Sequence, residues 1–335
     1  MQGFWQGRSV LVTGAGGFLG GWLVSALLDR GADVVAILRD GSPQSMLVRD
    51  GLIDRISTVR GDIQDFALLR RAMSEYDVQT VFHLAAQAIV GVAKVDPIDT
   101  LEINVRGSWN VLEAARLCKI KQIVVASSDK AYGSSANLPY REDDPLRGSY
   151  PYDVSKSCTD LISAMYATTY GLPVAIARCA NLFGGGDLNF SRTIPGAILA
   201  TMNAQPLVIR SDGKFVRDLL YVKDAAAAYL LLAEQLSQKP SLAGEAFNFS
   251  MEVRHTVLEL LDMVLALMDR KDLRPIIQNA ASSEIREQYL STDKAARILG
   301  WKPEYNMTEA LQETINWYRL YYSKEPEKQA AGTAA

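Results

Sequence analysis

The first apolar run of the chain ends in a glycine-rich turn that leads directly into a helix-length segment. The sequence there is VLVTGAGGFLGGWLVSALL, with Gly14, Gly17 and Gly20 at intervals of three. Between a strand and a helix, such glycines permit a tight turn, let backbone amides approach a pyrophosphate, and allow close helix–strand packing. The segment therefore predicts a dinucleotide site, with Phe18 and Leu19 at the start of the helix among the cofactor contacts.

Apolar, β-branched runs alternate with amphipathic segments through the first half of the chain. Strands are expected over Ser9–Thr13, Asp33–Leu38, Ile56–Arg60, Thr80–Leu84, Gln122–Ser127 and Pro173–Arg178. Helices are expected over Phe18–Arg30, Phe66–Tyr76, Asp99–Cys118 and Tyr152–Tyr170. This alternation predicts an α/β fold of the Rossmann type, a doubly wound parallel sheet that binds its ligand at the C-terminal ends of the strands.

After Arg178 the alternation gives way to a glycine-rich loop and scattered elements. Helices are expected near Ile194–Asn203, Val257–Met268 and Thr308–Tyr321, and a strand near Pro206–Arg210. We expect a dinucleotide-binding domain over 1–179, to which 214–250 return through Val222–Leu236 and Ala246–Phe249. A smaller C-terminal substrate lobe is expected over 180–213 and 251–325, with a flexible tail at 326–335.

Composition narrows the classes of partner. The 35 basic and 38 acidic residues are interleaved and give a net charge of −3, so no basic face for nucleic acid or a membrane surface is expected. The residues before the glycine turn lack the apolar stretch and cleavage site of a secretion signal, so none is expected, and no apolar run approaches the ~20 residues that a membrane span needs. Cys118, Cys158 and Cys179 lack paired spacing, which argues against disulfides and a metal site. A cytoplasmic protein with a small-molecule partner is expected.

The end of the second strand bears on the choice of cofactor. An acidic residue usually holds the ribose 2′-hydroxyl of NAD there, but this chain has Leu38 followed by Arg39. A guanidinium suits a 2′-phosphate, so NADP is favoured and NAD is the alternative, unless Arg39 is a solvated arginine beside an exposed Asp40. Asp62 and Ile63 follow the third strand, where they either cover an adenine or simply cap the next helix.

Chemically active side chains cluster after the fifth strand. VVASSDKAYG (124–133) ends that strand, and YPYDVSK (150–156) opens the next helix. Tyr152 and Lys156 are one helical turn apart and therefore project from one face. The lysine cation, together with an oxidised nicotinamide, is expected to lower the pKa of the phenol so that it accepts a hydroxyl proton.

The motifs TGAGGFLG, FHLAAQ, NVRGSWNVLEAA, SSDKAYG, YDVSK and VRDLLYVKD, taken in this order, resemble those of the extended short-chain dehydrogenase/reductase family over residues 8–320. The resemblance implies that Ser128, Tyr152 and Lys156 form the hydride-transfer triad, with Asn104 as a structural partner on the preceding helix. It also implies a tightly bound cofactor lying along Leu84, Ala85, Ala86 and Asn104, and a homodimer formed through the helices over Asp99–Cys118 and Tyr152–Tyr170.

The two residues after Ser128 distinguish subfamilies. Asp129 and Lys130, together with AAQ, NLFGGGD and ILGW, most resemble the CDP-glucose 4,6-dehydratases, whereas the second position is typically glutamate in the dTDP-glucose and GDP-mannose enzymes. The resemblance implies that Lys130 removes the C5 proton of a nucleotide-linked hexose while Asp129 protonates the departing 6-hydroxyl. Three alternatives stay open: a 4-epimerase, a non-catalytic NADP(H)-binding regulator, and a surface salt bridge between Asp129 and Lys130.

Substrate contacts are also implied by the resemblance. Asn181, Arg192 and Arg217 are expected near the diphosphate, which needs charge-assisted donors, and Gln87 is expected beside the sugar nucleotide. The alternative for each is a salt bridge or polar contact between the two lobes. His83 and His255 are expected to be structural.

Overall fold

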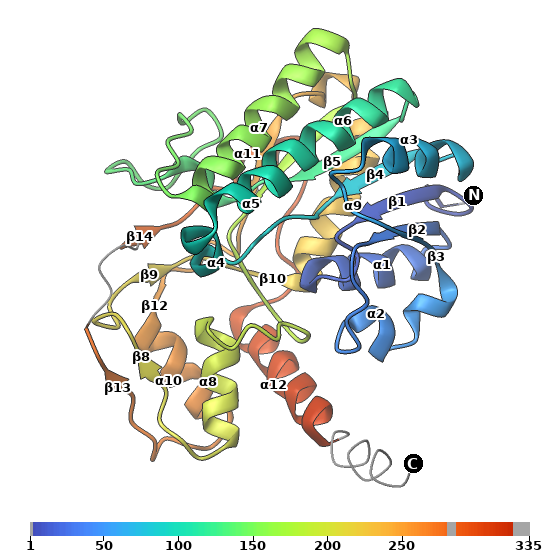
Figure 1. Cartoon of the computed structure of the whole chain (residues 1–335). Coiled ribbons are helices and arrows are strands. Elements are labelled where there is room, and N and C mark those ends of the chain that lie inside the picture. The colour runs from blue at the N-terminus through green and yellow to red at the C-terminus, as the bar shows by residue number, and fades with distance from the viewer. Residues whose placement is uncertain (1–2, 280–285, 324–335) are drawn as a thin grey trace, which may run out of the picture.

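The computed structural model describes residues 3–279 and 286–323. A sheet of seven parallel strands crosses its centre in the order β11-β6-β5-β4-β1-β2-β3 (Figure 1). The strands are β1 (Ser9–Thr13), β2 (Asp33–Leu38), β3 (Ser57–Arg60), β4 (Thr80–His83), β5 (Gln122–Ala126), β6 (Val174–Cys179) and β11 (Ala246–Phe249). The doubly wound parallel sheet that the sequence predicts is therefore confirmed, and each predicted strand lies within a residue of its expected bounds.

Helices cover both faces of this sheet. Those on one face are α3 (Phe66–Glu75), α6 (Gly107–Leu117) and α7 (Pro151–Tyr170), and those on the other are α1 (Phe18–Asp29) and α9 (Val222–Gln238). Side chains alternate along β1, so Val10 and Val12 join the core beneath α1 and α9, while Leu11 joins the core beneath α3 and α6. Burial on both faces explains why the strand sequences are nearly continuous apolar runs.

The expected helix over Asp99–Cys118 is wrong as a single continuous α-helix. The segment consists of α5 (Pro97–Leu101), a π-helical turn (Glu102–Arg106) and α6. Within the π turn, Asn104 donates from Nδ2 to the Ser155 hydroxyl at 2.9 Å and to the Gln87 carbonyl at 3.1 Å. Apolar periodicity does not reveal one extra residue in a turn, because the residues on either side still face the core.

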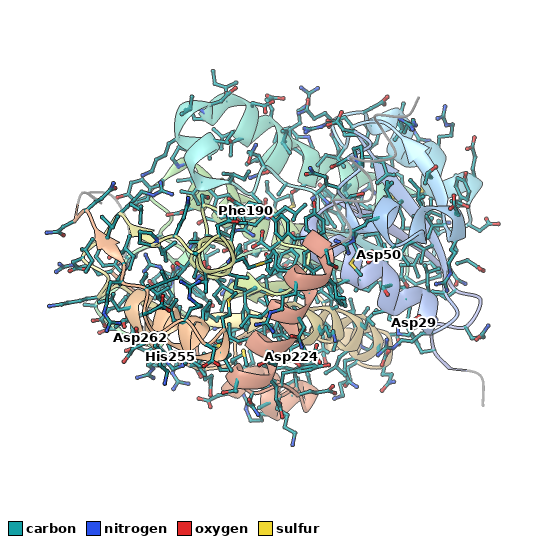
Figure 2. All side chains as sticks on the ribbon, turned by 90° about the horizontal axis from the view of Figure 1, so that it is seen from below. Asp29, Asp50, Phe190, Asp224, His255 and Asp262 are labelled. Atoms are coloured by element: carbon teal, nitrogen blue, oxygen red, sulfur yellow. The ribbon has the colours of Figure 1, made fainter. Side chains whose placement is uncertain are left out.

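The second half of the chain supplies a smaller lobe. It contains α8 (Thr193–Met202), α10 (Val257–Leu267) and α12 (Met307–Ser323) as predicted, while the expected strand near Pro206–Arg210 is reduced to β8 (Val208–Ile209). In the view from below, Phe190 lies near the middle, with Asp50 toward one side and His255 and Asp262 toward the other (Figure 2). The exact lobe boundaries stay a prediction, and the expected tail at 326–335 lies outside the described residues.

Two elements of the second half rejoin the main sheet. Helix α9 packs against α1, and β11 pairs in parallel with β6, neighbours that the sequence did not specify. The remaining elements are short: α2 (Met46–Arg49), α4 (Val90–Val95), α11 (Asp293–Leu299), β7 (Asn181–Phe183), β9 (Val216–Arg217), β10 (Leu219–Tyr221), β12 (His255–Thr256), β13 (Ile276–Ile277), β14 (Glu287–Gln288), and 3-10 turns over Leu52–Arg55, Asp129–Tyr132 and Pro240–Leu242. None of the helices in the described part of the chain is both long and apolar enough to cross a membrane.

Candidate active site

A cavity of 1320 Å³ runs along the C-terminal ends of the parallel strands and into the smaller lobe. It begins beside β1, the strand whose neighbours are β2 on one side and β4 on the other. The order of the strands reverses at this point, and sheets of this kind bind ligands where it does. The cavity is thus the candidate active site.

The glycine turn forms the end of the cavity next to β1. Gly14 has φ +73°, and a Cβ there would lie 2.6 Å from the backbone nitrogen of Ala85, so a larger residue would collide with the next loop. A Cβ on Gly20 would lie 2.1 Å from the Gly14 carbonyl oxygen. Gly17 precedes α1 without a side-chain cap, which leaves the N–H groups at Phe18 and Leu19 for a ligand. This cradle fits a pyrophosphate, and all of these residues line the cavity.

Arg39 follows β2, on the same side of the cavity as the glycine turn, and is already paired. Its Nε donates to Asp40 Oδ2 at 2.8 Å, and both side chains are exposed. This hydrogen bond, aided by the charges of Asp40, Asp62 and Asp99, raises the pKa of Arg39 despite partial desolvation. The sequence left two interpretations of Arg39 open, a cofactor contact and a solvated arginine beside Asp40. Features of both are present, because Arg39 lines the cavity and also pairs with an exposed Asp40.

Asp62 and Ile63 lie on the same wall of the cavity. Asp62 Oδ1 accepts from the backbone N–H of Gln64 at 2.9 Å, so this carboxylate also orders the turn before α3. Ile63 is buried and lies beneath Gly107, where a Cβ would meet its side chain at 2.4 Å. The sequence predicted that these two residues either cover an adenine or order the start of the next helix. In the structure they line the cavity, and Asp62 also orders the turn before α3.

The loop after β4 lines the middle of the cavity. Leu84, Ala85 and Ala86 all face it. Gln87 and Asn104 are not among the residues that line the cavity. The Gln87 N–H donates to Asn104 Oδ1 at 2.7 Å, and Asn104 Nδ2 donates to the Gln87 carbonyl in return. Asn104 therefore has a structural position, because its side-chain amide binds the main chain of Gln87 and holds the loop after β4.

Ser128, Tyr152 and Lys156 meet at the centre of the cavity. Ser128 ends the segment after β5, and the other two lie on the first turns of α7. Burial and the charge of Asp129 raise the pKa of the Tyr152 phenol well above its ordinary value, while Ser128 and Arg192 lower it. The protein by itself therefore does not lower the pKa of Tyr152 as the sequence predicts, because burial and the charge of Asp129 outweigh the Ser128 hydrogen bond and the charge of Arg192.

Lys156 is held by the main chain. Its Nζ donates to the Ala126 carbonyl at 2.7 Å and lies 6.0 Å from the centre of the Tyr152 ring. Burial lowers the pKa of Lys156 to about 8. Beside it, His83 bridges the hydroxyls of Thr13 and Ser108, and burial, followed by the charge of Lys156, lowers the pKa of His83 to about 3. The histidine is therefore neutral and structural, as expected.

Asp129 and Lys130 follow Ser128 on a 3-10 turn and also face the cavity. Asp129 is 1% exposed, and its Oδ1 accepts from the Ser128 hydroxyl at 2.8 Å. Its Oδ2 is buried without a hydrogen-bond partner in the described part of the protein. Lys130 Nζ donates to Gln288 Oε1 at 3.1 Å and more weakly to Asn181 Oδ1 at 3.5 Å. A surface salt bridge is excluded for this pair, because the acid is buried and the lysine is held by neutral amides.

The far end of the cavity contains the predicted contacts to a diphosphate. Asn181, Arg192 and Arg217 all line it. Arg192 Nη1 donates to the buried Asp187 carboxylate at 2.9 Å, which holds the guanidinium at the start of α8. Arg217 lies over the Phe215 ring, with 5.3 Å between the guanidinium carbon and the ring centre. Three polar or cationic side chains, from β7, the start of α8 and β9, thus line the same cavity.

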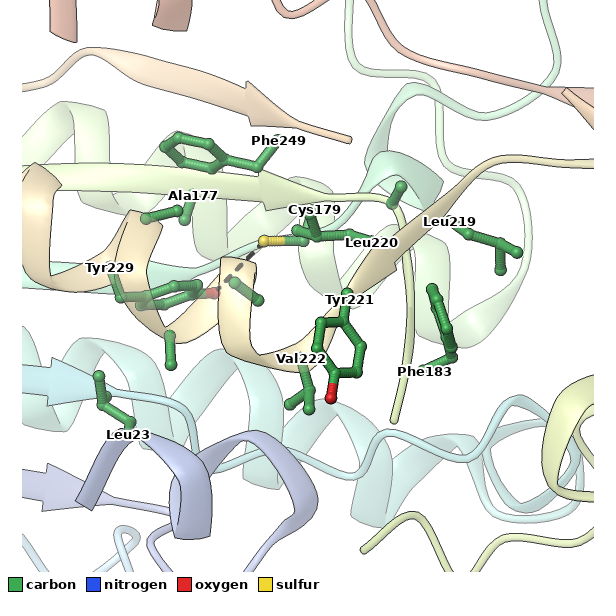
Figure 3. Packing of buried hydrophobic residues seen from close by; sticks show 14 of the residues in the cluster. Leu23, Ala177, Cys179, Phe183, Leu219, Leu220, Tyr221, Val222, Tyr229 and Phe249 are labelled. Atoms are coloured by element: carbon green, nitrogen blue, oxygen red, sulfur yellow. Dashed lines mark hydrogen bonds between the residues drawn. The ribbon is translucent and has the colours of Figure 1, made fainter. Parts of the chain in front are cut away.

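Gln288, Tyr229 and Cys179 are among the lining residues that the sequence analysis did not predict. Gln288 belongs to a two-residue strand far along the chain and carries no motif. Tyr229 on α9 and Cys179 at the end of β6 form the inner wall, with 4.0 Å between the Cys179 sulfur and the Tyr229 hydroxyl (Figure 3). Burial raises the pKa of Cys179 to about 12, so the thiol stays protonated and is not a nucleophile. The pairing of β6 with β5 and β11, the packing of α9, and the pairing of β14 with β9 bring these residues to the site.

Comparisons with known proteins agree with this site. The NAD dependent epimerase/dehydratase family matches residues 10–249. CDP-glucose 4,6-dehydratase of Salmonella typhimurium is 31% identical over 97% of this chain and 94% of that protein. The structure of UDP-glucose 4-epimerase of Thermotoga maritima with UDP-glucose superposes with a TM-score of 0.85 at 26% identity, covering 94% of this chain and 100% of that one.

A second solved structure, dTDP-glucose 4,6-dehydratase of Bacillus anthracis in complex with NAD, has a TM-score of 0.82 at 26% identity and covers 93% of this chain and 96% of that one. Nucleotide-sugar 4,6-dehydratases and 4-epimerases are thus both relatives. With the glycine cradle, the Ser128–Tyr152–Lys156 group and the family match in place, the chain belongs to the NAD-dependent epimerase/dehydratase family and has the extended short-chain dehydrogenase/reductase fold.

Proposed function

We propose that the chain is a nucleotide-diphosphate-hexose 4,6-dehydratase that acts on CDP-glucose or a related hexose nucleotide. The observation that carries the proposal is the buried Oδ2 of Asp129, which has no hydrogen-bond partner among residues 3–279 and 286–323 and lies in the same cavity as Lys130, Tyr152 and Lys156. A 4-epimerase needs only a group for oxidation and reduction at C4. Elimination of water needs an additional acid and base, which this pair supplies.

The cofactor would be held by the glycine turn, the wall formed by Asp62 and Ile63, and the loop over residues 84–86, all of which line the cavity. The chemistry that NAD supplies when bound is to accept a hydride from C4 of the sugar and to give it back at C6. Lys156, fixed by the Ala126 carbonyl, would hold a positive charge near the phenol of Tyr152 and favour its ionisation.

The side chains of the protein would move the protons. Tyr152 accepts the proton of the 4-hydroxyl as C4 becomes a ketone, and the ketone makes the C5–H bond acidic. Lys130, as a neutral amine or through a water, accepts the C5 proton. The C6–O bond breaks as Asp129 donates a proton to the 6-hydroxyl, so that water leaves and a C5=C6 double bond remains for reduction.

We infer that NAD is preferred over NADP, in contrast to the preference that Arg39 suggested in the sequence. The support is electrostatic, because a 2′-phosphate next to Arg39 would also lie near Asp40 and Asp62. Arg39 already has a counter-ion at hydrogen-bond distance in Asp40. A ribose with a free 2′-hydroxyl adds no negative charge there.

We further propose that the chain forms a homodimer through α5, α6 and α7. Large apolar side chains on these helices are unusually exposed, including Ile98 at 75%, Leu161 at 60% and Trp109 at 43%. Leu161→Glu is expected to convert a dimer into a monomer in light scattering, with Leu320→Glu on the exposed side of α12 as the matched control. A wild-type protein that is monomeric at micromolar concentration would contradict the proposal.

The function is tested by incubating the protein and NAD with CDP-, GDP-, UDP- and dTDP-hexoses and following the loss of water by mass spectrometry. A 4-keto-6-deoxy product, which absorbs in alkali, supports the proposal. The matched control is Asp129→Asn combined with Lys130→Ala, which removes the acid and the base but leaves Tyr152. A 4-epimer without any 4-keto-6-deoxy sugar would assign the epimerase activity instead, and cofactor binding without turnover of any nucleotide sugar would indicate a regulator.

A further inference from the structure

Gln288 brings the smaller lobe into contact with Lys130. It is 2% exposed and lines the cavity, and its Oε1 accepts from Lys130 Nζ at 3.1 Å. Its Nε2 is buried and has no hydrogen-bond partner among the residues that the structure describes. One half of this amide is therefore used by the lysine, while the other half is a donor without an acceptor.

The main chain fixes the direction of the Gln288 side chain. Strand β14 lies beside β9 (Figure 1). The two strands pair in parallel, in a register that sets Gln288 opposite Arg217. Just beyond it, the backbone N–H of Leu290 donates to the buried Asp218 carboxylate at 2.9 Å. Because side chains alternate along a strand, Glu287 is exposed and Gln288 points inward. The amide is thus held against Lys130 rather than free to rotate away.

The two acceptors of Lys130 are both neutral carbonyl oxygens, those of Gln288 and Asn181. A neutral amine has two N–H bonds and one lone pair. When both N–H bonds are donated to amides, the lone pair takes the remaining tetrahedral direction. A carboxylate in either place would instead favour the ammonium form, which has no lone pair to accept a proton.

We propose that Gln288 is a positioning residue that orients Lys130 for removal of the C5 proton, while its free Nε2 donates to an oxygen of the bound hexose. This inference rests on the proposed dehydratase function. A buried donor without a partner is unfavourable, and a sugar hydroxyl or ring oxygen supplies the missing acceptor. Gln288 would therefore contact the bound hexose through Nε2 and Lys130 through Oε1, so that substrate binding helps to orient the base.

The test compares Gln288→Met, which keeps the length of the side chain but removes the amide, with Glu287→Met on the exposed face of the same strand as the matched control. Each protein with NAD is mixed with CDP-glucose, or with whichever of the four nucleotides the wild type dehydrates, in deuterated water. Cofactor reduction and C5 deuterium incorporation are measured separately. Gln288→Met is expected to slow C5 exchange by about 10- to 100-fold with cofactor reduction unchanged, because the base is misplaced.

A second variant gives a readout that a purely structural role would not change. Gln288→Glu keeps the size and the acceptor, but its charge favours the ammonium form of Lys130, so the pH profile of C5 exchange is expected to move to higher pH. Wild-type C5 exchange in Gln288→Met, an unshifted profile in Gln288→Glu, or equal loss of cofactor reduction and C5 exchange would overturn the inference. A wild type that dehydrates none of the four nucleotides would instead remove the proposed function.

Discussion

The catalytic centre consists of two neighbouring groups of side chains, here named the tyrosine end and the lysine end, which differ in how the chain builds them. The tyrosine end, which comprises Ser128, Tyr152 and Lys156, comes from the end of β5 and the first turns of α7. The lysine end, which comprises Asp129, Lys130, Asn181 and Gln288, combines the 3-10 turn after β5 with β7 and β14. The first is thus contained in one strand–helix unit, while the second requires both lobes.

The two lysines show what this difference means. Lys156 is held by a backbone carbonyl, which no substitution of a side chain removes, whereas Lys130 is held by two side-chain amides. A group fixed by the main chain is suited to a step that all members of a family share. A group fixed by replaceable side chains can be adjusted without changing the fold, and this is where we expect relatives with different reactions to differ.

The largest expected effect is at the tyrosine end, because both halves of the reaction follow from the first oxidation. We expect Tyr152→Phe to reduce the rate of cofactor reduction by about 10²- to 10⁴-fold, since it removes the hydroxyl that accepts the 4-hydroxyl proton. Stopped-flow nicotinamide absorbance checks this, with an unchanged thermal unfolding midpoint as evidence of an intact fold. Near-normal turnover would mean that the tyrosine end is not where the reaction begins.

Lys130→Ala is expected to separate the oxidation step at the tyrosine end from the elimination step at the lysine end. Cofactor reduction by substrate should persist, while C5 deuterium exchange and loss of water fall by about 10²-fold or more, because the base is gone and the oxidising group is intact. Asp129→Asn is the contrasting variant, since it should retain C5 exchange better than dehydration. Dehydration by Lys130→Ala at the wild-type rate would show that the lysine end is not needed for elimination.

A pH-dependent effect on stability is expected at Asp218, which anchors the strand that carries Gln288. Burial raises the pKa of Asp218 to about 7. A carboxyl with a higher pKa in the folded than in the unfolded chain stabilises the fold below about pH 4, and this contribution is lost as the pH rises through about 7. The free energy of unfolding relative to Asp218→Asn should therefore fall by on the order of 2 kcal/mol between pH 5 and pH 8.

Urea unfolding at both pH values measures this difference. Asp262→Asn, on the exposed side of α10, is the control for a carboxyl that makes no such buried contacts (Figure 2). A difference that stays constant between pH 5 and pH 8 would show that the Asp218 carboxyl titrates alike in the folded and unfolded chains.

The smallest effect is expected at Arg39, which belongs to neither the tyrosine end nor the lysine end. Because the guanidinium is exposed and already paired with Asp40, Arg39→Ala should change NAD binding by less than about 0.5 kcal/mol. Isothermal titration with NAD and NADP, using Arg30→Ala as a surface control, measures this. A selective loss of NADP binding by ~1.5–3 kcal/mol would restore the NADP preference that the sequence suggested.

Local patterns determined much of the fold and of the tyrosine end. The strands of the large domain were predictable because burial on both faces requires continuous apolar runs, and the glycine turn because its conformation excludes a Cβ at Gly14. Tyr152 and Lys156 were predictable because a helix sets residues four apart on one face. Asp129 and Lys130 could be assigned to the site because they follow Ser128 in the loop after the C-terminal end of β5.

Tertiary structure alone decided the partners of these residues and the electrostatics around them. Gln288 reaches Lys130 through a two-residue strand, which is too short to show any periodicity and whose register depends on a pairing with β9. The raised pKa of Tyr152 reflects burial by elements from the whole chain, and the π turn at Asn104 adds one residue that periodicity does not detect. Sequence specifies geometry where neighbours along the chain set it, whereas contacts between distant segments depend on how the whole molecule packs.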